Sequence, residues 1–447
     1  MEKNLTIGSV WKTIFFFSLP YFFSYFLQTL YGMADLFIIG QFNGVDSTTA
    51  VSIGSQVMHM LTVMIVGLAM GSTVMIGRAV GGNDRKQVNL AVGNTVTLFV
   101  AVSLVLMVGL LLAAGGIVNL MSTPEEAVSG TKQYLLICFV GIPFITAYNI
   151  ISSIFRGMGD SKSPMYFIIV ACICNIGLDY LFIGGFSMGA AGAALGTTLS
   201  QVISVIIALT FILRKKMIPG FRKADLKPRG DMLGRILKVG VPVCLQDGFI
   251  QISFLVITVF ANLRGINDAA AVGIVEKLIG ILFLVPSSML STVSALCAQN
   301  MGAGKHDRSL KTLQYAAIIA VGFGLVAASL MQFLAVPAVG LFTKDAEVMR
   351  LGGQYMRSYV WDCVFAGVHF CFSGYFCAYG LSGISFIHNV ASILLARIPL
   401  AYWASTHFAD TLYPMGWAAP AGSMISVVIC GAAFVWMKKH PEKLTSG

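Results

Sequence analysis

Residues 91–115 read AVGNTVTLFVAVSLVLMVGLLLAAG, a run of 25 positions without a charged side chain. A helix of about 20 apolar residues crosses the hydrocarbon core of a membrane, which is about 30 Å thick. The run is apolar on every side, as expected of a helix that meets lipid and other helices rather than water. It therefore predicts a membrane-spanning helix.

Comparable apolar runs cover most of the chain. They predict twelve membrane-spanning helices, near residues 13–40, 48–77, 91–115, 132–156, 163–184, 190–213, 236–262, 270–298, 312–341, 354–380, 383–405 and 416–437. The composition agrees, because 57% of the 447 residues are hydrophobic and 11% are charged, against about 25% charged in a soluble domain. The predicted fold class is an all-α polytopic membrane protein. The charged opening MEKNLTIGSVWK precedes a run too long for a signal peptide, so we expect an uncleaved first helix.

Lysine and arginine predict the orientation. The N-terminus, the loops that follow even-numbered helices and the C-terminus carry 22 of the 29 basic residues, whereas the opposite loops carry five. Because basic loops remain in the cytoplasm, both termini are predicted to be cytoplasmic and the location to be the plasma (inner) membrane. The net charge of +10 reflects this asymmetry, so nucleic acid is not an expected partner.

The two halves of the chain resemble each other. Pro20 precedes Pro242 by 222 residues, and Tyr134 precedes Tyr355 by 221. Further pairs follow at nearly the same offset, including Asp84-Arg85 with Asp307-Arg308 and Ala50-Val51 with Ala271-Val272. Such a repeat is expected of a carrier that alternates by rocking and is unusual for an enzyme.

The repeat predicts the domain organisation. An N-terminal lobe (1–213) and a C-terminal lobe (239–447) would each contain six helices, joined by a basic cytoplasmic linker (214–238). Because each lobe has an even number of helices, both enter the membrane from the same side. We therefore expect a pseudo-twofold axis along the membrane normal.

Several ionisable residues fall inside predicted spans. They are Asp35, Asp179, Asp247, Glu276, Lys277, Asp362 and Arg397. A charge at the bilayer centre costs about 2.5–3.5 kcal/mol, so each needs a partner, a proton or water. We expect Arg397 to hold an acid of the C-terminal half. Asp247 and Asp362 are equally compatible with an interfacial position.

One set of polar residues suggests an ion site in the N-terminal half. Asn175 and Asp179 are four residues apart and share a helix face, while Asp35 and Asn149 lie in two other spans. Two carboxylates flanked by amides could share a proton or hold a monovalent cation. Hydrogen bonds between packed helices are the simpler interpretation. Pro20 removes a backbone hydrogen bond from the first helix and is the predicted hinge.

Other patterns are interpreted as packing. The nine cysteines lie in apolar spans without CxxC spacing, so neither a metal cluster nor a disulfide is predicted. The Gly-rich run 189–196 opens a span rather than following a strand, which favours helix packing over nucleotide binding. The lone histidines His59 and His369 are interpreted in the same way. No P-loop occurs, so uphill transport would depend on an ion gradient.

Four motifs carry a family resemblance, in order and at matching spans. They are ADLFIIGQFNG (34–44), YNIISSIFRGMGDSKSPM (148–165), NIGLDYLFIGG (175–185) and AVGIVEKLIGILFLVP (271–286). With them the chain resembles prokaryotic multidrug and toxic compound extrusion (MATE) transporters over nearly its whole length. The resemblance implies export of amphiphilic, often cationic, compounds in exchange for H⁺ or Na⁺. It implies no cofactor and no catalytic residues, with the bilayer and small-molecule substrates as partners and a monomeric protein.

The resemblance also assigns residues. The implied cation or proton site consists of Asp35, Asn149, Asn175, Asp179 and Thr197. Candidate polar residues of the C-lobe or cavity are Asp247, Gln251, Glu276, Lys277, Asp362 and Arg397. The chain departs from relatives that place a glutamate in the middle of the seventh helix, where it has Gln251 and, a turn earlier, Asp247. A sodium site in the C-lobe is therefore not expected.

Two other functions compete with drug export. A flippase for lipid-linked oligosaccharides would need several basic residues in its cavity, and only Lys277 and Arg397 are candidates. An intramembrane enzyme would need a nucleophile–base pair or a metal cluster, and no spacing supports one.

Overall fold

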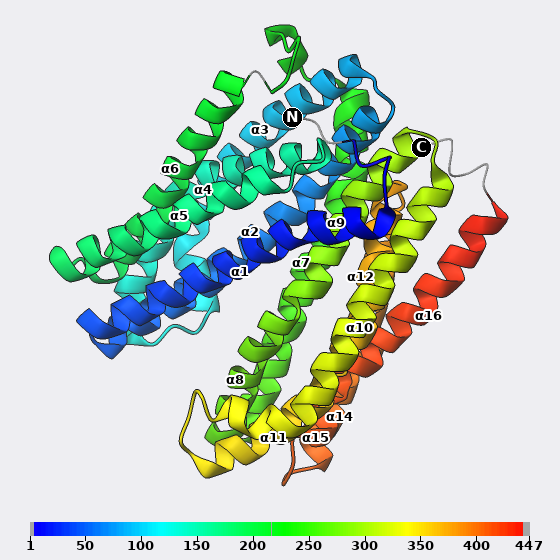
Figure 1. Ribbon diagram of the computed structural model, residues 1–447. Coiled ribbons are helices and arrows are strands. Elements are labelled where there is room, and N and C mark those ends of the chain that lie inside the picture. The colour runs from blue at the N-terminus through cyan, green and yellow to red at the C-terminus, as the bar shows by residue number, and fades with distance from the viewer. Residues whose placement is uncertain (1–3, 216, 441–447) are drawn as a thin grey trace. The chain divides into compact units, whose positions relative to one another are not determined.

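Helices make up almost all of the computed structural model, which describes residues 4–215 and 217–440 (Figure 1). No strand occurs within these ranges. Eleven helices of the described chain are long and apolar enough to cross a membrane, and α11 with α12, bent by 41° at their junction, forms a twelfth candidate span. The predicted all-α polytopic membrane fold is confirmed.

The first six candidate spans coincide with the first six predicted runs. They are α1 (Val10–Phe42), α2 (Val45–Gly81), α3 (Arg85–Leu120), α4 (Glu125–Gly157), α5 (Lys162–Asp179) with the π-helical turn η1 (Tyr180–Gly185), and α6 (Gly189–Lys215). The run 91–115 lies within α3. This helix begins where the Asp84 side chain accepts a hydrogen bond from the backbone N–H of Gln87 at 3.0 Å, a contact that stabilises a helix N-terminus.

The remaining spans follow the short 3₁₀ turn η2 (Lys223–Leu226). They consist of α7 (Gly230–Arg264), α8 (Ile266–Leu282) with α9 (Leu284–Gly302), α10 (His306–Val339), α11 (Ala346–Tyr359) with α12 (Asp362–Ala378), α13 (Ser382–Ser392) with η3 (Ile393–Arg397) and α14 (Ile398–His407), and α15 (Tyr413–Gly416) with α16 (Ala418–Lys439). The break between α8 and α9 lies beside Pro286, which cannot donate a backbone hydrogen bond. The π-helical turn η3 similarly adjoins Pro399.

The chain packs as two compact units. The first contains Phe23–Leu237, and the second contains Leu5–Phe22 with the described chain from Lys238 onward. The helix α1 is continuous through Pro20. It therefore passes from the second unit to the first within one turn after that proline.

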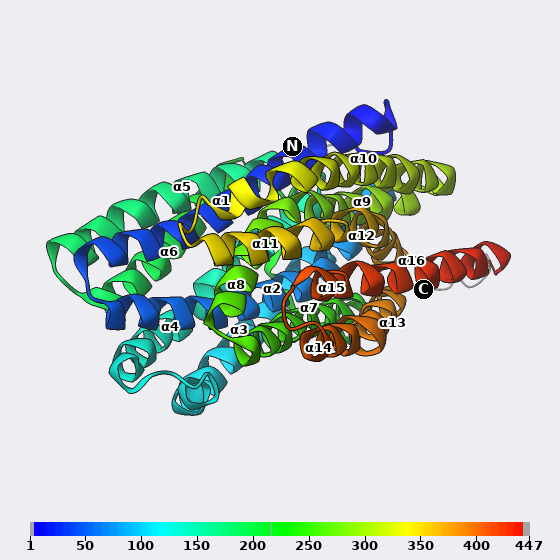
Figure 2. The same cartoon turned by 90° about the horizontal axis from the view of Figure 1, so that it is seen from below.

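Each unit has its own apolar core, and the repeat pairs occupy both. In the first unit α4 packs against α2, α3 and α6. In the second, α12 packs against α9, α10 and α16, and α13 and α14 also contact α16 (Figure 2). The repeat pairs that are buried in these two cores are Ala50 with Ala271, Val51 with Val272, and Tyr134 with Tyr355. Residues that correspond in the sequence repeat are therefore buried in the apolar core of each unit.

The basic connection is held against α3 of the first unit. The backbone N–H of Arg229 donates to the side-chain carbonyl of Asn94 at 2.7 Å, and the Thr97 hydroxyl donates to the carbonyl of Leu226 at 2.6 Å. A side chain at Gly93 would overlap the backbone of Asp225. Polar side chains and a glycine at the start of α3 thus fix a segment whose composition alone suggests a loose linker.

Candidate functional site

Two aspartates meet inside the first unit. Asp35 of α1 is 3% exposed and Asp179, the last residue of α5, is fully buried. Their carboxyl groups lie in contact, with Asn175 beside them. The Thr197 hydroxyl of α6 donates a hydrogen bond to Oδ2 of Asp35 at 3.1 Å. Three helices therefore bring four of the five residues of the implied ion site together.

The site has fewer donors than acceptors. Oδ1 of Asp35 and both carboxyl oxygens of Asp179 are buried without a hydrogen-bond partner among the described residues. The side-chain amide of Asn175 is likewise unpartnered there. Two bare carboxylates in contact repel each other and lose hydration on burial, so the arrangement favours a bound proton or a small cation between them.

No hydrogen bond joins Asn149 to this set within the described residues. Its side chain is buried on α4, and its amide donates to the carbonyl of Ile145, one turn earlier on the same helix, at 2.8 Å. Its described bond is thus made within its own helix rather than to either aspartate.

Gly196 is a site residue that sequence reasoning missed. It belongs to the Gly-rich run at the start of α6, and a side chain there would overlap Oδ1 of Asp179. The glycine lets the backbone of α6 approach the carboxylate. The Gly-rich run 189–196 predicts close helix packing. In the structure, α6 packs closely against α5 at the carboxylate of Asp179.

A second polar cluster lies in the second unit. Nη2 of Arg397 in η3 is 3.2 Å from Oδ2 of Asp362, and both side chains are at most 9% exposed. The guanidinium also lies 5.0 Å from the ring centre of Phe254. Arg397 therefore holds an acid of the C-terminal half, as expected, and Asp362 is buried at the start of α12.

One further C-terminal candidate lies near this cluster, because Glu276 interacts electrostatically with Arg397. Glu276 is half-buried on α8 and accepts a hydrogen bond from the Thr258 hydroxyl at 3.4 Å. Lys277 is exposed, whereas Asp247 and Gln251 are half-buried on α7. Asp247 contacts the side chain of its neighbour Gln246.

The interpretation of His369 as a lone histidine is wrong. Its ring centre on α12 lies 5.4 Å from that of His388 on α13, and both residues are buried. Nε2 of His388 is 2.9 Å from the Ser373 hydroxyl. The two histidines are 19 positions apart in sequence, so only the packing of α12 against α13 reveals the pair.

Comparison with known proteins reveals a family. A sequence model of the MatE family matches the chain twice, over residues 20–181 and 242–403. The two matches begin at Pro20 and Pro242, as the internal repeat predicts.

Individual relatives agree along most of the chain. The probable multidrug resistance protein YoeA of Bacillus subtilis is 26% identical over 98% of this chain and 96% of its own. The multidrug export protein MepA of Staphylococcus aureus is 25% identical over 82% of this chain and 81% of its own. A multidrug resistance MATE family transporter of the MOP superfamily, solved facing outward, is 22% identical and has a TM-score of 0.90. That likeness covers 100% of this chain and 99% of the other.

Proposed function

This chain belongs to the MatE family, and we propose that it is a secondary antiporter that exports amphiphilic organic cations in exchange for H⁺ or Na⁺. Membership makes it a membrane transporter rather than an enzyme, and its relatives named above support drug export. The contact between Asp35 and Asp179 carries the proposed ion coupling, because two buried carboxylates with unpartnered oxygens need a positive charge.

The proposed cycle uses that site as a switch. A proton or Na⁺ bound at the Asp35–Asp179 pair, with Asn175 and Thr197 in its shell, removes the repulsion between the carboxylates. The segment of α1 that carries Asp35 then repositions about Pro20, and the protein rocks between its two openings. Ion and substrate thus compete through the conformation of the N-terminal lobe.

Cationic substrates are proposed from the balance of charge inside the spans. Arg397 is paired with Asp362, whereas Asp35 and Asp179 are buried and have no salt bridge within the described ranges. Glu276 and Asp247 add half-buried acids. This excess of acid disfavours a flippase for lipid-linked oligosaccharides, since a pyrophosphate would need several free basic groups.

Transport into proteoliposomes tests the proposal. Purified protein is reconstituted, and uptake of a fluorescent organic cation is followed under an imposed proton gradient and, separately, under a sodium gradient. We expect one gradient to drive accumulation and its ionophore to abolish it. A parallel assay follows flipping of a lipid-linked oligosaccharide in the same vesicles. Flipping without drug accumulation would overturn the proposal.

We further propose a monomer in the plasma (inner) membrane with both termini in the cytoplasm. The asymmetry of the basic loops supports this orientation. Cysteine labelling from each side of the membrane, at Ser9 of the N-terminal segment and at Thr343 between α10 and α11, would test it. The first is expected to react only from the cytoplasm and the second only from outside.

A further inference from the structure

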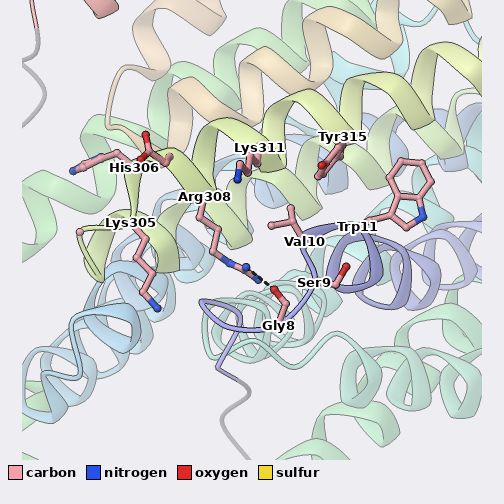
Figure 3. Close-up of a pocket in the computed structure, with 11 residues that line it drawn as sticks. Gly8, Ser9, Val10, Trp11, Lys305, His306, Arg308, Lys311 and Tyr315 are labelled. Carbon is pink, nitrogen blue, oxygen red and sulfur yellow. Dashed lines mark hydrogen bonds between the residues drawn. The ribbon is translucent and has the colours of Figure 1, made fainter.

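The second unit contains a cavity of about 680 Å³ where the N-terminal segment meets the start of α10 (Figure 3). Its walls combine three basic residues, one acid, one histidine and two aromatic rings. The lining residues are Gly8, Ser9, Val10, Trp11, Gly304, Lys305, His306, Asp307, Arg308, Lys311 and Tyr315. All belong to one compact unit.

Two of the basic residues, Arg308 and Lys305, bind the N-terminal segment that forms one wall of the cavity. The Arg308 guanidinium donates a hydrogen bond to the carbonyl of Gly8 at 2.7 Å (Figure 3). It also donates to the carbonyl of Ile7 at 2.8 Å. Nζ of Lys305 donates to the carbonyl of Thr6 at 2.9 Å. These bonds hold the N-terminal segment against α10 and so form one wall of the cavity.

The remaining positive groups have no described partner of opposite charge. Lys311 is exposed, and no ion pair to it occurs within the described residues. No side chain caps the N-terminus of α10, a helix of 34 residues whose first turn carries a partial positive charge. At the matching turn of the first unit, Asp84 caps α3. The cavity thus presents a lysine and an uncapped helix end, with Asp307 as its one acid.

With distance from the cavity, the exposed side chains on α10 and α1 change from basic to aromatic and then to aliphatic. On α10, Lys311, Tyr315 and Ile318 are exposed at helical spacing along one face. On α1, Trp11 is 46% exposed and Phe15 is 50% exposed one turn further on. The rings of Trp11 and Tyr315 meet edge to face, with centres 5.8 Å apart. Basic, then aromatic, then aliphatic side chains match, in that order, the phosphate, glycerol and acyl regions of a phospholipid.

From this arrangement we propose that the cavity binds the phosphate-bearing headgroup of an anionic phospholipid. The phosphate lies against Lys311 and the N-terminus of α10, the glycerol region lies beside Trp11 and Tyr315, and an acyl chain follows Ile318 and Phe15. A free phosphate would use the charges but not the apolar stripe. This inference does not depend on the transported substrate or on the coupling ion.

Trp11 is a built-in reporter for the test. The protein is reconstituted in phosphatidylcholine vesicles that contain either brominated phosphatidylglycerol or the same fraction of brominated phosphatidylcholine, and tryptophan fluorescence is measured. We expect stronger quenching by the anionic lipid. Trp11→Phe removes the difference, because the other four tryptophans lie outside the cavity.

Charge variants identify the site. Lys311→Gln is expected to weaken binding of phosphatidylglycerol about fivefold, the effect of one basic residue near an anionic surface, and Lys311→Glu to abolish the preference. Lys86→Gln, at an exposed basic residue near the start of α3 that does not line this cavity, is the matched control and is expected to bind normally. Equal quenching by both lipids would overturn the proposal. Reversal of the quenching by millimolar inorganic phosphate would overturn it as well, since the ligand would then be a free anion.

Discussion

Gly196 of α6 lies against the carboxylate of Asp179 of α5. The carboxylate occupies the space that the Cβ atom of any other residue at position 196 would need. Asp179 in turn contacts Asp35 of α1. A residue without a side chain therefore sets how closely the two acids and α6 approach each other. This relationship makes a small substitution a sensitive probe of the proposed ion site.

Gly196→Ala is expected to impair coupled transport while the protein still reaches the membrane. The added methyl group overpacks the site at a cost of about 1–3 kcal/mol, which corresponds to roughly a five- to hundredfold loss of ion affinity. Gly177→Ala on α5 is the control, because no atom would lie within 4 Å of the added carbon. Drug efflux at a series of ion concentrations distinguishes the two variants, and equal behaviour would show that the contact has no role.

Asp35→Asn is expected to abolish gradient-driven efflux, and Asp179→Asn to reduce it nearly as far. An amide keeps the shape of the carboxyl group but cannot bind a proton or supply the charge that holds a cation. Asp247→Asn is expected to have much less effect, because Asp247 is half-buried and contacts an amide rather than a second acid. Drug export and ion counterflow are measured for all three variants. Normal coupled transport by Asp35→Asn would exclude the proposed site.

A single ion site predicts the electrical signature of transport. Exchange of one monovalent organic cation for one H⁺ or Na⁺ moves no net charge. A membrane potential of 100 mV, worth about 2.3 kcal/mol per charge moved, would then contribute nothing to accumulation. Vesicles with an imposed potassium diffusion potential and no proton or sodium gradient are therefore expected not to accumulate drug. Accumulation under the potential alone would imply a second coupling ion.

The Arg397–Asp362 pair is expected to stabilise the second unit. Replacing one partner leaves a buried charge unpaired, which costs about 3–5 kcal/mol. Asp362→Asn or Arg397→Gln should each lower the thermal unfolding temperature in detergent, and the double variant should recover part of the loss. Arg350→Gln breaks an exposed pair with Glu347 and should leave unfolding unchanged. A double variant no more stable than the single ones would show that the pairing is not the cause.

Pro20→Ala is expected to slow transport without weakening ion binding. The substitution restores a backbone hydrogen bond donor in α1 near the point where the helix passes from the second unit to the first. Pro143→Ala, inside α4 of the first unit, is the control. Turnover and ion binding are measured separately. Unchanged turnover in Pro20→Ala would remove the proline from the cycle, whereas loss of ion binding would indicate a local structural role.

Much of the fold was predictable because the bilayer constrains it directly. A span must be long, apolar and internally hydrogen-bonded, so the run 91–115 and its counterparts reveal α3 and the other helices without any tertiary information. The pairing of Asn175 with Asp179 was also predictable, since four residues on a helix place two side chains on one face. The π-helical turn η1 and the bend between α11 and α12 were not predictable from hydropathy, because a break inside an apolar run leaves its composition unchanged.

The sequence by itself determined the class of the molecule, its repeat and the identities of the buried acids, because hydropathy and spacing act along the chain. Only the tertiary structure decided which of those acids meet. Asp35 contacts Asp179, which is 144 positions away in the sequence. Arg397 forms its ion pair with Asp362 rather than with Glu276, and the ring of His369 packs against that of His388. Such pairs arise because an ionisable or polar group buried in a helical unit takes whichever neighbour the packing provides, and that neighbour lies on another helix.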